Sequence, residues 1–234
     1  MPRRIPLLAR VAAVVGPLAI AVAGCASERE ASSAPSVSEV VVVAGSVEPG
    51  PPTSANTVVD VDHLAMVGDS ITVGSTAELE VAFEEIGFPD AEINAEGGRR
   101  IVRNNGITSG VEGVAEVLED GEQPDLWVVA LGTNDVANYP PEQFPDVISE
   151  LLAAIPADAT VVWVDTYVED FQEDAAVFDS ILREVLAERG NASVVDWYSI
   201  AGEDGMLYDG VHPSGFGKAE FARRVTEAVN VWTT

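Results

Sequence analysis

Hydrophobic and polar positions follow two different periods between residues 57 and 234. Five short runs are rich in β-branched and other apolar residues, which is typical of strands. Longer stretches between and after them place apolar residues at helical spacing, with Gly near several ends. The expected strands are 63–67, 92–96, 126–131, 160–165 and 193–197, and the expected helices are 75–87, 110–121, 141–155, 173–190 and 215–232.

Strands that alternate with helices predict a parallel sheet covered on both faces. We therefore expect an α/β fold, a three-layer α/β/α sandwich around a central, mainly parallel five-stranded sheet. Ligands of such sheets bind beyond the carboxyl ends of the strands. Small and polar residues gather there: "GDS" (68–70), "GGR" (97–99), "GTND" (132–135) and, after a loop, "DGVH" (209–212).

The first 24 residues are typical of an export signal. Three arginines precede an apolar run over 11–23, which is shorter than the roughly 20 residues that span a bilayer. The following "VAGC" resembles a bacterial lipobox, which implies that Cys25 is lipidated and that the protein is extracytoplasmic and anchored to the cell membrane. Cys25 is the only cysteine, so an intramolecular disulfide is excluded.

Residues 25–56 are rich in Ser, Ala, Glu, Pro and Gly, which predicts a flexible tether, and 57–234 has the size of one domain. The chain has 12 basic and 39 acidic residues and a net charge of −27. Loss of 1–24 removes three basic residues and gives 9 − 39 = −30. Such a charge excludes nucleic acid as a partner and opposes binding to anionic lipid, so the acyl chains on Cys25 have to hold the protein at a membrane.

A serine hydroxyl becomes a nucleophile when a histidine removes its proton and a carboxylate holds the other ring nitrogen. His63 lies at the opposite end of the first strand from Ser70, which makes it an awkward base. His212 follows Asp209 by three residues, so that one tight turn lets the carboxylate reach the imidazole.

The four blocks "GDS", "GGR", "GTND" and "DGVH", in this order, resemble the SGNH hydrolases, the GDSL esterase and lipase superfamily, whose fold is flavodoxin-like. The resemblance implies that Ser70 is the nucleophile, His212 the general base and Asp209 the group that orients it. It also implies an oxyanion hole made by the backbone N–H of Ser70, a backbone N–H of the second block and the side-chain amide of Asn134.

The second block offers two glycines for that oxyanion donor. Gly98 is favoured, because "Gly-Arg" resembles the pattern of family members that act on cell-wall acetyl groups. Gly97 stays open as the alternative, and either glycine is also explained by a tight turn with positive φ.

Three neighbours of these residues are expected to have structural roles. Asp69 is predicted to bond nearby backbone and shape the nucleophile turn, which Thr72 supports. Asp135 is predicted to cap the turn that presents Asn134.

Arg99 and Arg100 are candidates for contact with an anionic or sugar substrate, although pairing of one of them with carboxylates is slightly favoured. Tyr167, just after the fourth strand, is a candidate to line a substrate pocket. Trp127 and Trp163, inside strands, are expected in the core.

Two histidines and no paired cysteines leave little for zinc, so we expect no metal and no cofactor. The expected activity is hydrolysis of carboxylic esters through an acyl-enzyme, and a monomer is the favoured state. The substrate suggested by location and by the second block is a small acyl group on cell-envelope carbohydrate, and a lipid or a soluble ester fits nearly as well. Two alternatives remain, an acyltransferase that passes the acyl group to a sugar hydroxyl and a non-catalytic envelope binding protein.

Overall fold

The computed structural model describes residues 59–103, 106–119, 121 and 123–233. The predicted signal peptide, the predicted tether and Cys25 lie outside the described residues. Among the residues that are described, none of the helices has both the length and the apolar composition needed to cross a membrane.

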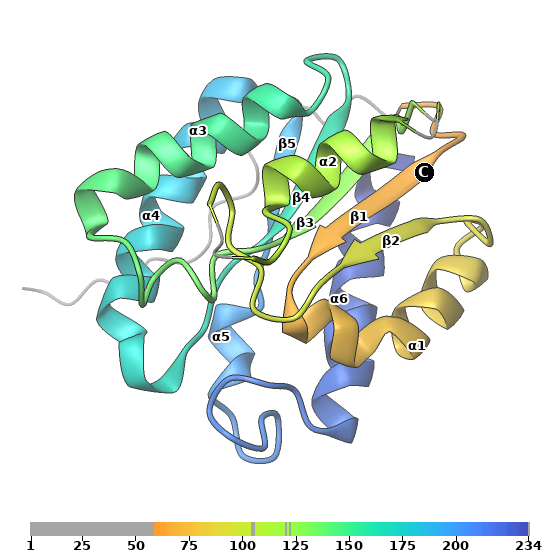
Figure 1. Cartoon of the computed structure of the whole chain (residues 1–234). Coiled ribbons are helices and arrows are strands. Elements are labelled where there is room, and N and C mark those ends of the chain that lie inside the picture. The colour runs from red at the N-terminus through yellow and green to blue at the C-terminus, as the bar shows by residue number, and fades with distance from the viewer. Residues whose placement is uncertain (1–58, 104–105, 120, 122, 234) are drawn as a thin grey trace, which may run out of the picture. The chain divides into compact units, whose positions relative to one another are not determined.

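The centre of the domain is a five-stranded sheet in the order β2-β1-β3-β4-β5, with every neighbouring pair parallel (Figure 1). The predicted α/β fold is therefore confirmed, and the sheet is fully parallel. Its strands begin and end within two residues of the predicted bounds. They are β1 (Leu64–Gly68), β2 (Glu92–Ala95), β3 (Leu126–Ala130), β4 (Thr160–Val164) and β5 (Ala192–Val195).

The helices lie on both faces of the sheet (Figure 1). They are α1 (Ser70–Glu85), α2 (Gly110–Glu119), α3 (Phe144–Ala154), α4 (Gln172–Arg189), α5 (Tyr198–Ala201) and α6 (Gly215–Thr233), with 3₁₀ turns at Pro141–Gln143 and Glu169–Phe171. Two differ from the prediction. Helix α1 begins at Ser70 rather than at residue 75, and α5 was not predicted because its four residues are too few to show a period.

Alternate residues of each strand face two separate cores. Ala65, Val67, Trp127 and Trp163 pack with α2, α3 and α4. On the other face, residues such as Met66 pack with α1 and α6. Trp127 and Trp163 are fully buried, which confirms their predicted place in the core.

The strand order places the predicted chemistry at one edge of the sheet. Strand β1 pairs with β2 on one side and with β3 on the other, so the chain changes direction across the sheet beside β1. Crevices form beyond the carboxyl ends of strands at such a switch point. The segments 68–70 and 131–135 leave β1 and β3 at this point.

Candidate active site

Ser70 is the first residue of α1, directly after the buried strand β1. Asp69 is the N-cap of this helix, and its Oδ1 accepts the backbone N–H of Ile71 at 2.9 Å. The prediction that Asp69 bonds nearby backbone and shapes the turn is thus confirmed. A helix N-terminus also presents free N–H groups and a partial positive charge, which favour a negative charge that develops beside Ser70.

Close packing between Gly68 and Thr72 also supports the nucleophile turn. Thr72 is fully buried, and a Cβ added to Gly68 would lie only 1.9 Å from its Oγ1. The turn therefore needs glycine at position 68 for steric reasons.

His212 and Asp209 lie in the loop between α5 and α6. The carboxylate of Asp209 accepts the backbone N–H groups of Val211 and His212 at 3.1 and 2.8 Å through Oδ1. Its Oδ2 lies 2.8 Å from Nδ1 of the imidazole. These hydrogen bonds hold the pKa of Asp209 below its usual range, so the carboxylate is ionised at neutral pH.

The imidazole connects this loop to the nucleophile turn. Nε2 of His212 lies 3.0 Å from Oγ of Ser70, across 142 residues of sequence. Because the ionised Asp209 only accepts hydrogen bonds, Nδ1 must carry a proton, which leaves Nε2 free to accept the proton of Ser70. The structure thus brings together the three residues that the sequence grouped.

The site is open to solvent. The side chains of His212 and Asp209 are 33% and 42% exposed. Tyr208 stacks on the imidazole at a centroid distance of 5.7 Å and is itself 69% exposed. The sequence carried no signal for this stacking, since Tyr208 is simply the residue before Asp209.

Asn134 reaches the same turn from the end of β3. Its Nδ2 donates to Oδ2 of Asp69 at 3.2 Å and to the backbone oxygen of Arg99 at 3.0 Å. The loop after β1, the loop after β2 and the loop after β3 therefore meet at one side-chain amide. The contact with Asp69 was not predicted.

Gly98 and Gly97 are distinguished by their backbones. Gly98 has a φ of +76°, a conformation that favours glycine, whereas a Cβ at Gly97 would have open space. Of the two positions, Gly98 is therefore the one where the backbone conformation favours glycine. The oxyanion roles of Gly98, Asn134 and the Ser70 N–H stay predictions.

The predicted role of Asp135 was wrong. Its side chain does not cap its own turn: it accepts the backbone N–H of Ile101 at 3.1 and 3.3 Å, in the loop after β2. The turn itself is closed by the backbone bond from Asp135 N to Gly132 O at 2.8 Å. Burial raises the pKa of Asp135 to about 7 and that of Asp69 to about 6.

Arg99 is a buried residue whose side chain bonds backbone oxygens. Only 2% exposed, it donates from Nε to Thr108 O at 3.1 Å and from Nη1 to Asn94 O at 2.8 Å. Its nearest carboxylate, on Glu96, is 3.9 Å away. The predicted contact of Arg99 with a substrate stays a prediction. Arg100 lies over the ring of Tyr139, 5.7 Å from its centroid.

Tyr167 lines a small cavity next to the site, together with Ile71 and Thr133. This cavity holds at most about one water molecule, since only about 10 Å³ is open to the centre of a water. The predicted contact of Tyr167 with substrate stays a prediction.

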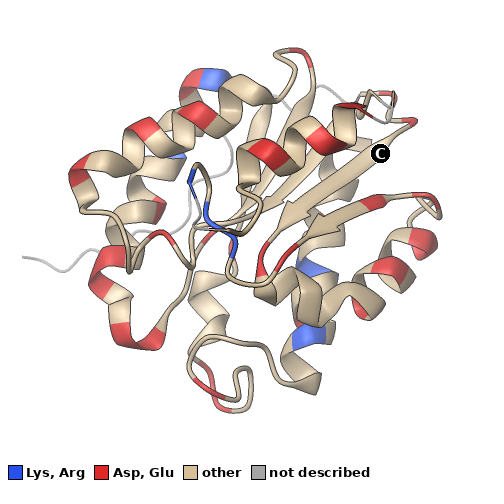
Figure 2. Cartoon of the chain, in the orientation of Figure 1, with Lys and Arg blue, Asp and Glu red and all other residues tan. Residues whose placement is uncertain are grey.

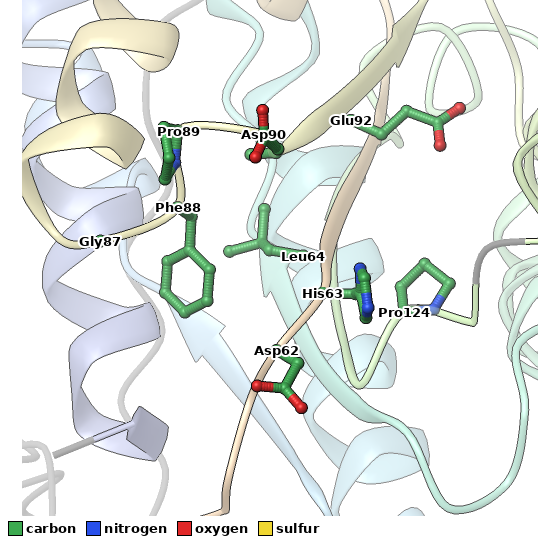
Figure 3. Close-up of a pocket in the computed structure, with 10 residues that line it drawn as sticks. Asp62, His63, Leu64, Gly87, Phe88, Pro89, Asp90, Glu92 and Pro124 are labelled. Atoms are coloured by element: carbon green, nitrogen blue, oxygen red, sulfur yellow. The ribbon is translucent and has the colours of Figure 1, made fainter.

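His63 lies far from this chemistry, as expected from its place before β1. It lines a hollow of about 770 Å³ together with Asp62, Phe88 and Pro124 (Figure 3). No group of three His, Cys, Asp or Glu side chains suited to a metal ion occurs among the residues that the structure covers.

The chain belongs to the GDSL-like lipase/acylhydrolase family, whose model matches residues 66–219. The family and the fold together support a hydrolase. A comparison with curated proteins found no match.

Three solved structures have a similar fold. The C-terminal catalytic domain of Streptococcus pneumoniae peptidoglycan O-acetyltransferase A is 19% identical, with a TM-score of 0.53 over 75% of this chain and 93% of that one. TesA is 20% identical, with a TM-score of 0.54 over 71% and 97% of the two chains. The psychrotrophic esterase EstA from Pseudoalteromonas sp. is 14% identical, with a TM-score of 0.53 over 73% and 98%. At these identities the likeness shows the fold.

Proposed function

We propose that the protein is a serine esterase that cleaves carboxylic esters through an acyl-enzyme on Ser70. The observation that carries the proposal is the geometry of His212, whose Nε2 lies 3.0 Å from Ser70 Oγ while Nδ1 lies 2.8 Å from Asp209. This is the arrangement that activates a serine hydroxyl.

In the first half of the reaction, Ser70 Oγ attacks the carbonyl carbon and its proton passes to Nε2 of His212. The ionised Asp209 stabilises the imidazolium that forms. When the tetrahedral intermediate collapses, the carbon–oxygen bond to the alcohol breaks and His212 returns the proton to the leaving oxygen. In the second half, water gives a proton to His212 and attacks the acyl carbon. The bond from that carbon to Ser70 Oγ then breaks, and His212 returns the proton to Oγ as the acid leaves.

The negative oxygen of both tetrahedral intermediates needs hydrogen-bond donors. The N-terminus of α1 supplies the N–H of Ser70, and Asn134 and Gly98 come from the two adjacent loops. Both amide hydrogens of Asn134 are engaged, by Asp69 and by Arg99 O, so an oxyanion has to share or replace one of these bonds. Loss of a single such donor typically lowers kcat by about 10² to 10³.

Short acyl groups on a carbohydrate are the substrate we favour. The sequence "GGR" (97–99) resembles that of family members that act on cell-wall acetyl groups, and the open rim at His212 leaves room for a large alcohol. The similar fold of a peptidoglycan O-acetyltransferase domain fits this proposal. A sugar hydroxyl in place of water would make the protein an acyltransferase by the same steps.

Placement at the cell envelope is part of the proposal. The "VAGC" sequence supports a lipid on Cys25. Acidic residues are spread over the helices, and basic residues lie in the loop between β2 and α2, on α4 and on α6 (Figure 2). This charge favours a solvated, monomeric domain held to the membrane through its lipid.

Hydrolysis of p-nitrophenyl esters of increasing chain length tests the proposal, with Ser70→Ala as the matched variant. We expect wild-type turnover that is highest for acetate and absent in Ser70→Ala. Equal turnover by both proteins would refute the role of Ser70. A preference for long chains would leave the esterase and refute the short acyl group.

A further inference from the structure

The loop after β2 is held by a buried arginine that belongs to neither the triad nor the predicted oxyanion donors. Arg99 is the one residue between Gly98 and Arg100, and its main-chain oxygen accepts the Nδ2 hydrogen of Asn134 at 3.0 Å. The two predicted side-loop donors, the N–H of Gly98 and the amide of Asn134, are therefore joined through the backbone of Arg99.

The side chain of Arg99 also holds that backbone in place, through bonds to two other segments. Its guanidinium spans the loop: Nη1 donates to Asn94 O in β2 at 2.8 Å and Nε donates to Thr108 O before α2 at 3.1 Å. The two carbonyls lie on the two stems of the loop, so one side chain ties both stems together. Two N–H groups of a planar fork set the direction of the side chain as well as its position.

Burial makes this arrangement specific. The residue is 2% exposed, and desolvation lowers the pKa of the guanidinium. A charge is rarely buried unless each of its hydrogen bonds is placed. Asp135, the residue after Asn134, accepts the N–H of Ile101. The segment 98–101 is therefore held by two neighbouring residues, because Asn134 bonds the Arg99 oxygen and Asp135 bonds Ile101 N.

From these contacts we infer that Arg99 is a positioning residue of the oxyanion hole, which holds Gly98 and Asn134 at the distance from each other that the oxyanion requires. The inference rests on the proposed function, since it concerns the donors of that reaction. It gives a reason other than substrate contact for an arginine at this position.

Gly113 gives a way to move the guanidinium without changing a residue of the site. A Cβ at Gly113, inside α2, would lie 2.9 Å from Nη1 of Arg99 and 3.2 Å from Oδ1 of Asn94. The far end of the arginine has to shift, which disturbs its 2.8 Å bond to Asn94 O. Alanine has the higher helix propensity, so Gly113→Ala is not expected to loosen α2.

The experiment measures Gly113→Ala and Arg99→Lys with p-nitrophenyl acetate. Lysine keeps the charge and reaches one carbonyl instead of two. We expect kcat to fall about 10- to 100-fold in Arg99→Lys and about 3- to 10-fold in Gly113→Ala, with KM within about threefold, because misplacement of the oxyanion donors weakens transition-state binding alone. Gly74→Ala, in α1, is the matched helix control, since its Cβ would meet only Lys218 at 3.9 Å, and should change kcat less than about twofold.

A double-mutant cycle with Asn134→Ala separates positioning from general stability. Because Arg99 positions Asn134 as well as Gly98, both variants should lower kcat by a clearly smaller factor in the Asn134→Ala background than in the wild type. Reductions that multiply in full would overturn the inference, as would unchanged kcat in both single variants. Should Arg99→Lys fail to fold, Gly113→Ala decides by the same comparison.

A spectroscopic measurement makes the test independent of turnover. The side-chain amide signal of Asn134 in an ¹⁵N correlation spectrum, assigned by its loss in Asn134→Ala, should move in Gly113→Ala and stay in Gly74→Ala. An unmoved signal would overturn the inference even if wild-type esterase activity is present. Absence of wild-type activity with a moved signal would refute the proposed function and leave the contact between Arg99 and Asn134 established.

Discussion

The nucleophile turn provides the sharpest steric prediction. In Gly68→Ala the new Cβ would lie 1.9 Å from Oγ1, 2.4 Å from Cβ and 2.9 Å from Cγ2 of Thr72. Thr72 is fully buried in the first turn of α1, so neither residue can move alone. The end of β1 or the start of α1 has to shift, and Ser70 is the first residue of α1.

Two magnitudes follow from this geometry. Overpacking of a buried site typically costs about 1–3 kcal/mol, and in a domain of this size about 1 kcal/mol lowers the unfolding midpoint by roughly 2–4 °C. The effect on catalysis is larger. A shift of about 1 Å in Ser70 would break the 3.0 Å contact with His212, and a misplacement of that size lowers the rate about 10²-fold.

Thermal unfolding and p-nitrophenyl acetate hydrolysis measure the two effects, and Thr72→Gly provides the rescue. That change removes all three clashing atoms, so Gly68→Ala combined with Thr72→Gly should regain most of the kcat/KM. Stability should not recover, because glycine in a helix costs about 1 kcal/mol. A single Gly68→Ala protein with wild-type kcat/KM, or a double variant no more active than the single one, would refute the steric reasoning.

Three further predictions concern the charges and donors around the site and the sheet. Asp209→Asn should lower kcat by about 10³ to 10⁴, because the amide no longer orients and stabilises the protonated imidazole; a loss below tenfold in ester hydrolysis would contradict it. Asn134→Ala should lower kcat by about 10² to 10³ with little change in KM, and an effect confined to KM would remove Asn134 from the oxyanion hole. Burial next to Asp165 raises the pKa of Asp179 to about 8. The folded state therefore keeps a proton that the unfolded chain releases above about pH 4, so stability is lost as pH rises from about 4 to 8. Asp179→Asn should raise the unfolding midpoint at pH 8 and leave it unchanged at pH 4, and equal shifts at both values would contradict the linkage.

The three central strands were predictable because β1, β3 and β4 are buried at every position and therefore have continuous apolar sequences. The edge strands β2 and β5 are mostly half-buried, and their place in the alternation of strands and helices made them predictable. The start of α1 was not, since "SITVGS" carries a glycine at 74 and reads as a turn. What begins the helix at Ser70 is the cap by Asp69, which bonds Ile71 N at 2.9 Å. Such a cap can be recognised from the sequence only when apolar residues at helical spacing begin directly after it.

The triad residues were grouped by sequence because each lies in a short, ordered block, and their distances agree with that grouping. The partners of the Arg99 and Asp135 side chains were not predicted, for one physical reason. These side chains bond backbone groups of other segments, Asn94 O and Thr108 O for Arg99 and Ile101 N for Asp135. A backbone partner has no residue type, so no pattern in the sequence points to it.

The central claim is that His212 and Asp209 activate Ser70, and labelling with an organophosphonate tests it most directly. Intact-mass and peptide analysis should find one phosphonyl group per chain, bound to Ser70, with no label in Ser70→Ala and much slower labelling in His212→Ala. Absence of labelling in the wild-type protein, together with absence of ester hydrolysis, would contradict the account and favour a non-catalytic binding protein on the same fold.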